Sequence, residues 1–135
     1  MKVFIDTNIV ISAILFPKGK VATVLSHILN KHTVVVSSYT KDECFDVFQK
    51  KFPTKTSLLE NFFETIGFET FNCPDQYDAT LFPEIRDTKD LPIIVSAILS
   101  DSDILLTGDK DFDDIKIDKP LIFSPTQYYE FIKNY

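Results

Sequence analysis

Val3-Phe4-Ile5-Asp6-Thr7-Asn8, near the start of the chain, joins three large apolar residues to an acid and two polar residues. A continuous apolar run predicts a short strand that is buried on both faces, which is typical of parallel sheets. Thr7 and Asn8 are residue types that cap helices, so a helix is predicted over residues 9–15. The stretch therefore predicts a buried strand that ends in an acid and leads directly into a helix.

The remainder of the chain continues this alternation of strands and helices. Short apolar or β-branched runs predict further strands over residues 33–37, 69–72, 104–106 and 121–123. Helical spacing of apolar residues predicts helices over residues 21–29, 39–51, 54–66, 91–99 and 125–133, with an ambiguous helical turn over 76–82. This order predicts an α/β fold with a parallel sheet flanked by helices. No repeat or linker divides the sequence, so we expect one domain over residues 1–135.

Composition narrows the class of protein. Hydrophobic residues make up 44% of the chain and charged residues 25%, which favours a globular core over disorder. No run of about 18 apolar residues is present, and Asp6 interrupts the apolar start that a secretory signal needs. Cys44 and Cys73 stand far apart, without the spacing of a zinc site or a disulfide framework. We therefore expect no membrane span and a cytoplasmic location.

Four acids stand where predicted strands end or predicted helices begin. Asp6 and Asp109 follow buried strands, whereas Glu43 and Asp90 lie near the starts of helices. Because ligands of open parallel sheets bind beyond the carboxyl ends of the strands, these acids are predicted to share one rim. Each acid taken alone is equally explained as a helix cap or a first-turn acid. Their convergence favours a functional site.

A divalent cation is the ligand that such a rim would attract. Clustered carboxylates repel one another, and oxygen ligands suit Mg²⁺ or Mn²⁺. Residues 107–114 hold four acids, of which Asp109 is the first ligand candidate and Asp111 the second. A metal site would also explain the net charge of −6, which by itself argues against nucleic-acid binding. Arg86 and Lys110 are candidate phosphate contacts, with a surface ion pair and local charge balance as the respective alternatives.

Three motifs follow one another along the chain, and one further acid stands between the first and the second. The motifs are Phe4-Ile5-Asp6-Thr7-Asn8, Ile85-Arg86-Asp87-Thr88-Lys89-Asp90 and Leu105-Leu106-Thr107-Gly108-Asp109-Lys110-Asp111-Phe112, and the acid is Glu43, after the second predicted strand. Together they resemble the PIN domain family, in particular the toxin-like branch related to VapC ribonucleases. The similarity spans nearly the whole chain in the same order.

The resemblance implies a three-layer α/β/α sandwich with a central, mostly parallel sheet and a Mg²⁺- or Mn²⁺-dependent ribonuclease activity. The implied catalytic and metal-binding acids are Asp6, Glu43, Asp90 and Asp109, with Asp111 as an accessory ligand. Thr7 and Asn8 would support the first-strand acid or a water. Asp42 and Asp87 remain alternatives to Glu43 and Asp90. The implied partners are an RNA substrate, a small antitoxin protein and a second copy in a homodimer.

Two other functions fit parts of the sequence. A haloacid-dehalogenase-like phosphatase also has an acid after its first strand and a late G-D-x-x-x-D, which Gly108, Asp109 and Asp113 match. That chemistry needs a second Asp where this chain has Asn8, which cannot transfer a proton. The other alternative is a catalytically idle PIN-like module that binds RNA or a protein.

Overall fold

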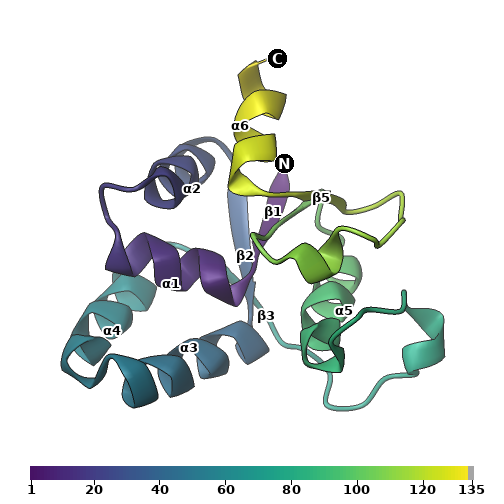
Figure 1. The fold of residues 1–135 in the computed structure, drawn as a ribbon, viewed down its shortest axis with the longest axis horizontal. Helices are drawn as coiled ribbons and strands as arrows, with labels where there is room; N and C mark the ends of the chain where they lie inside the picture. The colour runs from purple at the N-terminus through teal and green to yellow at the C-terminus, as the bar shows by residue number, and fades with distance from the viewer. Residues whose placement is uncertain (134–135) are drawn as a thin grey trace.

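A parallel five-stranded sheet forms the centre of the computed structural model, which describes residues 1–133 (Figure 1). Its strands are β1 (Lys2–Ile5), β2 (Thr33–Ser37), β3 (Glu69–Phe71), β4 (Ile104–Leu106) and β5 (Leu121–Phe123). The spatial order is β3-β2-β1-β4-β5, and each neighbouring pair is parallel. The register sets Phe4 of β1 beside Val35 of β2 and Leu105 of β4. β1 therefore occupies the middle of the sheet.

The direction in which the chain builds the sheet reverses beside β1. From β1 the chain adds β2 and β3 on one edge, then crosses over and adds β4 and β5 on the other. In parallel α/β sheets such a reversal opens a crevice at the carboxyl ends of the two strands that flank it. Here those strands are β1 and β4, which end immediately before Asp6 and Thr107.

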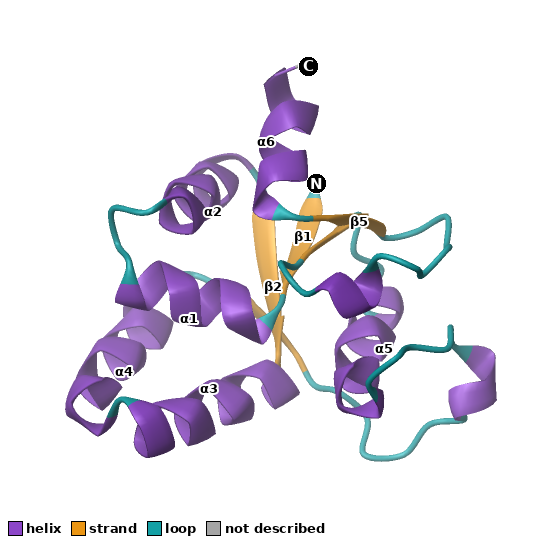
Figure 2. Cartoon of the chain, viewed as in Figure 1, coloured by secondary structure: helices purple, strands orange, loops and turns teal. Residues whose placement is uncertain are grey.

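Six helices in the described residues cover the sheet. They are α1 (Thr7–Leu15), α2 (Lys20–Lys31), α3 (Ser38–Lys51), α4 (Thr56–Thr65), α5 (Leu91–Leu99) and α6 (Pro125–Lys133). Figure 1 shows α1 to α4 on one side of the sheet and α5 on the opposite side. Figure 2 shows the loop-rich segment that joins β3 to α5 on the α5 side. The arrangement confirms the predicted three-layer α/β/α sandwich, with a sheet whose described strands are all parallel.

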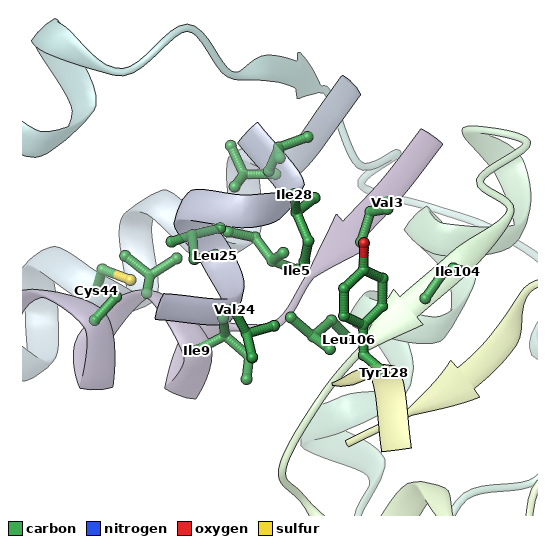
Figure 3. Close-up of a cluster of buried hydrophobic side chains, with 14 of the residues drawn as sticks. Val3, Ile5, Ile9, Val24, Leu25, Ile28, Cys44, Ile104, Leu106 and Tyr128 are labelled. Atoms are coloured by element: carbon green, nitrogen blue, oxygen red, sulfur yellow. The ribbon is translucent and has the colours of Figure 1, made fainter. Parts of the chain in front are cut away.

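Two hydrophobic clusters hold these layers together. In the larger cluster, on one face of the sheet, Val3 and Ile5 of β1 pack with Ile9, Leu25 and other apolar residues of the helices. Figure 3 shows the ring of Tyr128, from α6, beside Ile104 and Leu106 of β4.

On the other face of the sheet a smaller cluster joins Phe4 and Leu105 to Ile94 of α5 and to Phe112. Alternate residues of β1 thus enter opposite cores, which explains why Val3, Phe4 and Ile5 are apolar without interruption.

Differences from the predicted elements are confined to their ends. α1 starts at Thr7, two residues before the predicted start at residue 9, because Asp6 rather than Thr7 holds the N-cap position. Pro53 begins a separate 3₁₀ turn, Pro53–Lys55, and α4 starts only at Thr56. Within the ambiguous stretch 76–82, the helical part is the short 3₁₀ turn Ala79–Leu81.

No single helix of the described chain is long and apolar enough to cross a membrane. Only α1 and α2 taken together meet the criteria of length and composition, and these two helices are bent by 111° at the break between them.

The central core makes a matched test of the packing possible. Leu105 is fully buried in β4, whereas Leu99 at the end of α5 is 45% exposed. We expect Leu105→Ala to lower the free energy of unfolding by about 2–5 kcal/mol, because it leaves a cavity in the sheet core. Leu99→Ala should cost less than about 1 kcal/mol. Urea unfolding of both variants measures the difference, and equal losses would contradict this view of the core.

Candidate acidic centre

Asp6 lies buried at the end of β1, with only 5% of its surface exposed. Its backbone N–H donates to the carbonyl of Leu106 at 3.1 Å, which extends the pairing of β1 with β4 by one residue. Its side-chain Oδ2 accepts a hydrogen bond of 2.6 Å from the hydroxyl of Thr107. Although Asp6 occupies the N-cap position of α1, no side-chain cap bond is found there within residues 1–133. The carboxylate therefore lies at the junction of β1 and β4, where it contacts Thr107 and does not cap α1.

The loop after β4 carries two further acids, and Thr107 organises it. The backbone N–H of Asp109 donates to Thr107 Oγ1 at 3.1 Å. Asp109 Oδ1 in turn accepts from the N–H of Asp111 at 2.9 Å and caps the short 3₁₀ turn η4 (Lys110–Phe112). These bonds form a chain that runs from Asp6 through Thr107 to Asp109 and Asp111. The cap alternative thus holds for one oxygen of Asp109, which still remains at the rim.

A second acidic turn faces this loop. The 3₁₀ turn η3 (Thr88–Asp90) precedes α5, and Asp87 Oδ1 caps it by accepting from the N–H of Lys89 at 3.0 Å. Carboxylate oxygens of Asp87, Asp90 and Asp111 all lie within 4.8 Å of one another. One ligand atom from each acid is thus close enough to share a cation.

Glu43 reaches the same region from α3. The hydroxyl of Tyr39 lies 3.4 Å from Glu43 Oε2 and 3.1 Å from the carbonyl of Lys89, so it ties the start of α3 to η3. The charge of Glu43 also contributes to the raised pKa of Asp6. Asp42, the alternative to Glu43, is exposed and lines a separate pocket. We call Asp6, Glu43, Asp87, Asp90, Asp109 and Asp111 the acidic centre.

Burial, and to a lesser degree the neighbouring acids, raise the pKa values of Asp6 and Asp90. Burial raises the pKa of Asp6 to about 6, against the lowering effects of the Thr107 hydroxyl and the Thr7 backbone; Glu43 and Asp109 raise it slightly. Burial also raises the pKa of Asp90 to about 7, and the charge of Asp109 adds to this more than any other neighbour. Charged carboxylates are therefore unfavourable here until a cation balances them.

The donor set fits a hard divalent cation. The acids of the centre offer only carboxylate oxygens, which Mg²⁺ and Mn²⁺ prefer, and the candidate ligand group found in the described residues contains neither His nor Cys. The raised pKa values of Asp6 and Asp90 supply the electrostatic reason for such an ion to bind.

The remaining predicted site residues surround the acidic centre unevenly. Arg86 is 70% exposed and pairs with Asp114 at 3.3 Å and with Asp111 at 3.9 Å, which agrees with the ion-pair alternative. Lys110 is exposed beside Asp109, and Asn8 is exposed on α1. Thr7 is buried, and its Oγ1 has no hydrogen-bond partner in the described part of the chain.

Sequence reasoning missed three contributors to this site. Asp87 stood only as an alternative to Asp90, yet the structure brings both together with Asp111. Their spacing of three residues around one helical turn was the available signal. Thr107 and Tyr39 were not singled out, because a hydroxyl gains its role only from the carboxylate that it meets in space.

The fold and the site together define a parallel α/β domain with an acidic centre at its topological switch point. The model of the PIN domain matches residues 2–111, and the chain belongs to the PIN domain family. The predicted resemblance is thereby confirmed, and the phosphatase alternative loses its basis. No curated protein matches the sequence.

Solved structures reproduce the fold at low sequence identity. One is VapBC2 from Rickettsia felis, solved bound to a DNA fragment from its promoter. Its TM-score is 0.71 at 20% identity, covering 92% of this chain and 98% of the other. Another is FitAB bound to the IR36 DNA fragment, with a TM-score of 0.61 at 21% identity and coverage of 91% and 94%. These similarities establish the fold.

The raised pKa of Asp6 predicts how pH changes stability in the absence of metal. A carboxyl whose pKa rises from 3.8 unfolded to about 6 folded stabilises the protein below pH 4, and this contribution is lost as pH rises through 6. Asp6→Asn removes the titration and still offers an oxygen to Thr107. At pH 7 with chelator we therefore expect this variant to be more stable than wild type by about 2–3 kcal/mol.

The measurement is urea unfolding of both proteins between pH 4 and pH 7.5, with Asp46→Asn on the exposed face of α3 as the control. The advantage of Asp6→Asn over wild type should shrink towards pH 4. An advantage that is independent of pH would show that Asp6 titrates normally.

Proposed function

We propose that this PIN domain is a Mg²⁺- or Mn²⁺-dependent ribonuclease that hydrolyses phosphodiester bonds of RNA. The observation that carries the proposal is the convergence of carboxylate oxygens from Asp87, Asp90 and Asp111 within 4.8 Å, beside the buried Asp6. Without a cation these acids lower the stability of the folded protein, since burial disfavours the charged forms of Asp6 and Asp90. A role in binding a catalytic cation explains why the acids are present despite this loss of stability.

Each acid has a proposed role in this activity. Asp6, Asp90 and Asp109 hold the metal, with Asp111 and Asp87 as further ligands and Glu43 as a ligand or a base that orients water. A bound divalent cation neutralises phosphate charge and makes a water more acidic. Thr107 positions Asp6 through its 2.6 Å hydrogen bond, and the buried Thr7 supports the first turn of α1 behind Asp6.

The substrate phosphate has three proposed contacts at the rim. Arg86 and Lys110 are exposed cations next to the acidic centre, and Arg86 is held there by Asp114. Asn8 is exposed in the first turn of α1, whose N-terminus favours negative charge. These groups are few, in keeping with a chain of net charge −6. Affinity for RNA is therefore expected to depend mainly on the metal.

We further propose that the protein is the toxin component of a toxin–antitoxin pair in the cytoplasm and forms a homodimer. Similarity to structures of VapBC2 and FitAB supports a partner protein, since both were solved as two-component assemblies on DNA. A small antitoxin would block the acidic centre until it is removed.

Metal-dependent cleavage is the decisive test. We expect the purified protein to cut single-stranded RNA with Mn²⁺ or Mg²⁺ and to lose activity in chelator. Asp6→Asn should reduce the rate by about 100-fold or more, because a lost metal ligand removes several kcal/mol of charge stabilisation. Gel analysis of end-labelled RNA measures the rates, and Asp46→Asn should retain the wild-type rate.

One outcome would reject the ribonuclease, and another would reject the assigned site. Absence of cleavage across varied RNAs, combined with absence of Mn²⁺ binding, would leave an idle module that binds RNA or a protein. Full activity of Asp6→Asn would show that the catalytic site does not include Asp6.

The role of Asp87 can be tested without any substrate. We expect Asp87→Asn and Asp90→Asn each to weaken Mn²⁺ binding by about tenfold or more, because each removes one charged oxygen ligand. Isothermal titration calorimetry measures the affinities, with Asp46→Asn as a charge-matched control. Unchanged affinity in Asp87→Asn alone would assign Asp87 only to the cap of η3.

A further inference from the structure

A small pocket adjoins the acidic centre between the start of α3 and the loop after β3. Its volume is about 250 Å³, and its lining includes Ser38, Tyr39, Asp42, Asp75, Tyr77 and Pro92. Tyr39 connects the two sites, because it lines the pocket while its hydroxyl contacts Glu43 Oε2 at 3.4 Å. Pro92 lies in the first turn of α5, two residues after Asp90. The pocket is therefore within reach of an RNA strand that passes the acidic centre.

Contacts between the lining residues and behind them hold the walls of the pocket in place. The backbone N–H of Cys73 donates to Ser38 Oγ at 3.1 Å and fixes the loop against α3. The ring of Tyr77 packs edge-on against Phe82, with the ring centroids 5.8 Å apart. Two tyrosines and two prolines, Pro74 and Pro92, provide flat apolar surface. Since the volume is below the roughly 300–1,000 Å³ of pockets for drug-sized ligands, one planar ring system suits it.

The polar groups of the pocket select for hydrogen-bond donors. Asp42 and Asp75 are exposed carboxylates, and no hydrogen bond or ion pair of either side chain is found in the described residues. Because the lining found there has no Lys, Arg or His, a phosphate would be repelled. A nucleobase carries N–H donors without net charge, and RNA-binding proteins read such edges in unstacked bases.

Guanine matches a carboxylate better than the other bases do. Its Watson–Crick edge presents two neighbouring N–H donors, which the two oxygens of one carboxylate accept together. Adenine, cytosine and uracil each lack this pair of adjacent donors on that edge. Aromatic side chains such as Tyr39 and Tyr77 are suited to stack on the face of the same base.

We propose that this pocket is a guanine-binding subsite for a nucleotide that flanks the cleaved bond, with Asp42 or Asp75 reading the base and Tyr77 stacking on it. The inference rests on the proposed ribonuclease function for its biological meaning. It adds a base preference that the acidic centre alone, which contacts phosphate, does not supply.

Cleavage preference tests the subsite directly. The substrates are single-stranded RNAs that contain one guanosine in an otherwise guanosine-free sequence, cut in the presence of Mn²⁺. We expect wild type to cut beside guanosine at least about fivefold faster than elsewhere, and the double variant Asp42→Asn, Asp75→Asn to lose that ratio. Tyr77→Ala should also lower the ratio, whereas Tyr77→Phe keeps a stacking ring and should retain it. Asp46→Asn, on the same helix as Asp42 but outside the pocket, should keep the wild-type ratio.

Binding of mononucleotides separates this proposal from the ribonuclease itself. Guanosine 5′-monophosphate, but not the adenosine, cytidine or uridine nucleotides, should shift the amide NMR signals around Asp42 and Tyr77. This result in a protein that cuts no RNA would reject the ribonuclease and support the subsite. Cleavage without a guanosine preference, or with a preference that the double variant retains, would overturn the subsite. So would shifts caused by free arginine and by none of the nucleotides, which would assign the pocket to a cationic side chain of a protein partner.

Discussion

The hydrogen bond from Thr107 to Asp6 joins the ends of the two strands between which the sheet reverses direction. It gives a buried carboxylate a short, well-placed donor, and it partly offsets the burial that raises the pKa of Asp6. Thr107 also accepts from the backbone of Asp109, which in turn caps the turn that contains Asp111. The positions of three acids thus depend on one hydroxyl. The rest of the site is arranged around this junction.

Topology explains why so many acids meet in so small a domain. The carboxyl ends of β1 and β4 provide Asp6 and the loop with Asp109, while the turn before α5 brings Asp87 and Asp90 from the other face. Two of the acids are stabilised locally, because Asp87 and Asp109 each cap a short 3₁₀ turn through one oxygen. Together the acids of the centre create a charge that burial and mutual repulsion make unfavourable. A divalent cation is the simplest partner that removes this cost, and the family to which the chain belongs agrees with that view.

An acidic protein can bind RNA if separate parts of its surface contact the phosphate and the base. In the proposed function the acidic centre would hold the metal that neutralises phosphate charge. A few cations such as Arg86 lie at the rim, and the neighbouring pocket presents aromatic rings and carboxylates. Tyr39 belongs to both regions, since it contacts Glu43 with its hydroxyl and lines the pocket. In this arrangement the net charge of −6 is compatible with a nucleic-acid substrate. The proposals assign the acids of the centre to a metal and those of the pocket to the N–H donors of a base.

The sequence by itself determined the elements of the fold and the first acids of the site. Continuous apolar runs and helical spacing are local signals, so all five strands and all six helices of the described chain were predictable to within a few residues. Asp6 and Asp109 were predictable because they directly follow buried strands. Only the tertiary structure decided the strand order, the joining of Asp87 with Asp90 and Asp111, and the choice of Glu43 over Asp42 as a neighbour of Asp6. The reason is distance along the chain: Asp6 and Thr107 are 101 positions apart, and neither burial nor a hydrogen bond across that separation leaves a periodic trace in the sequence.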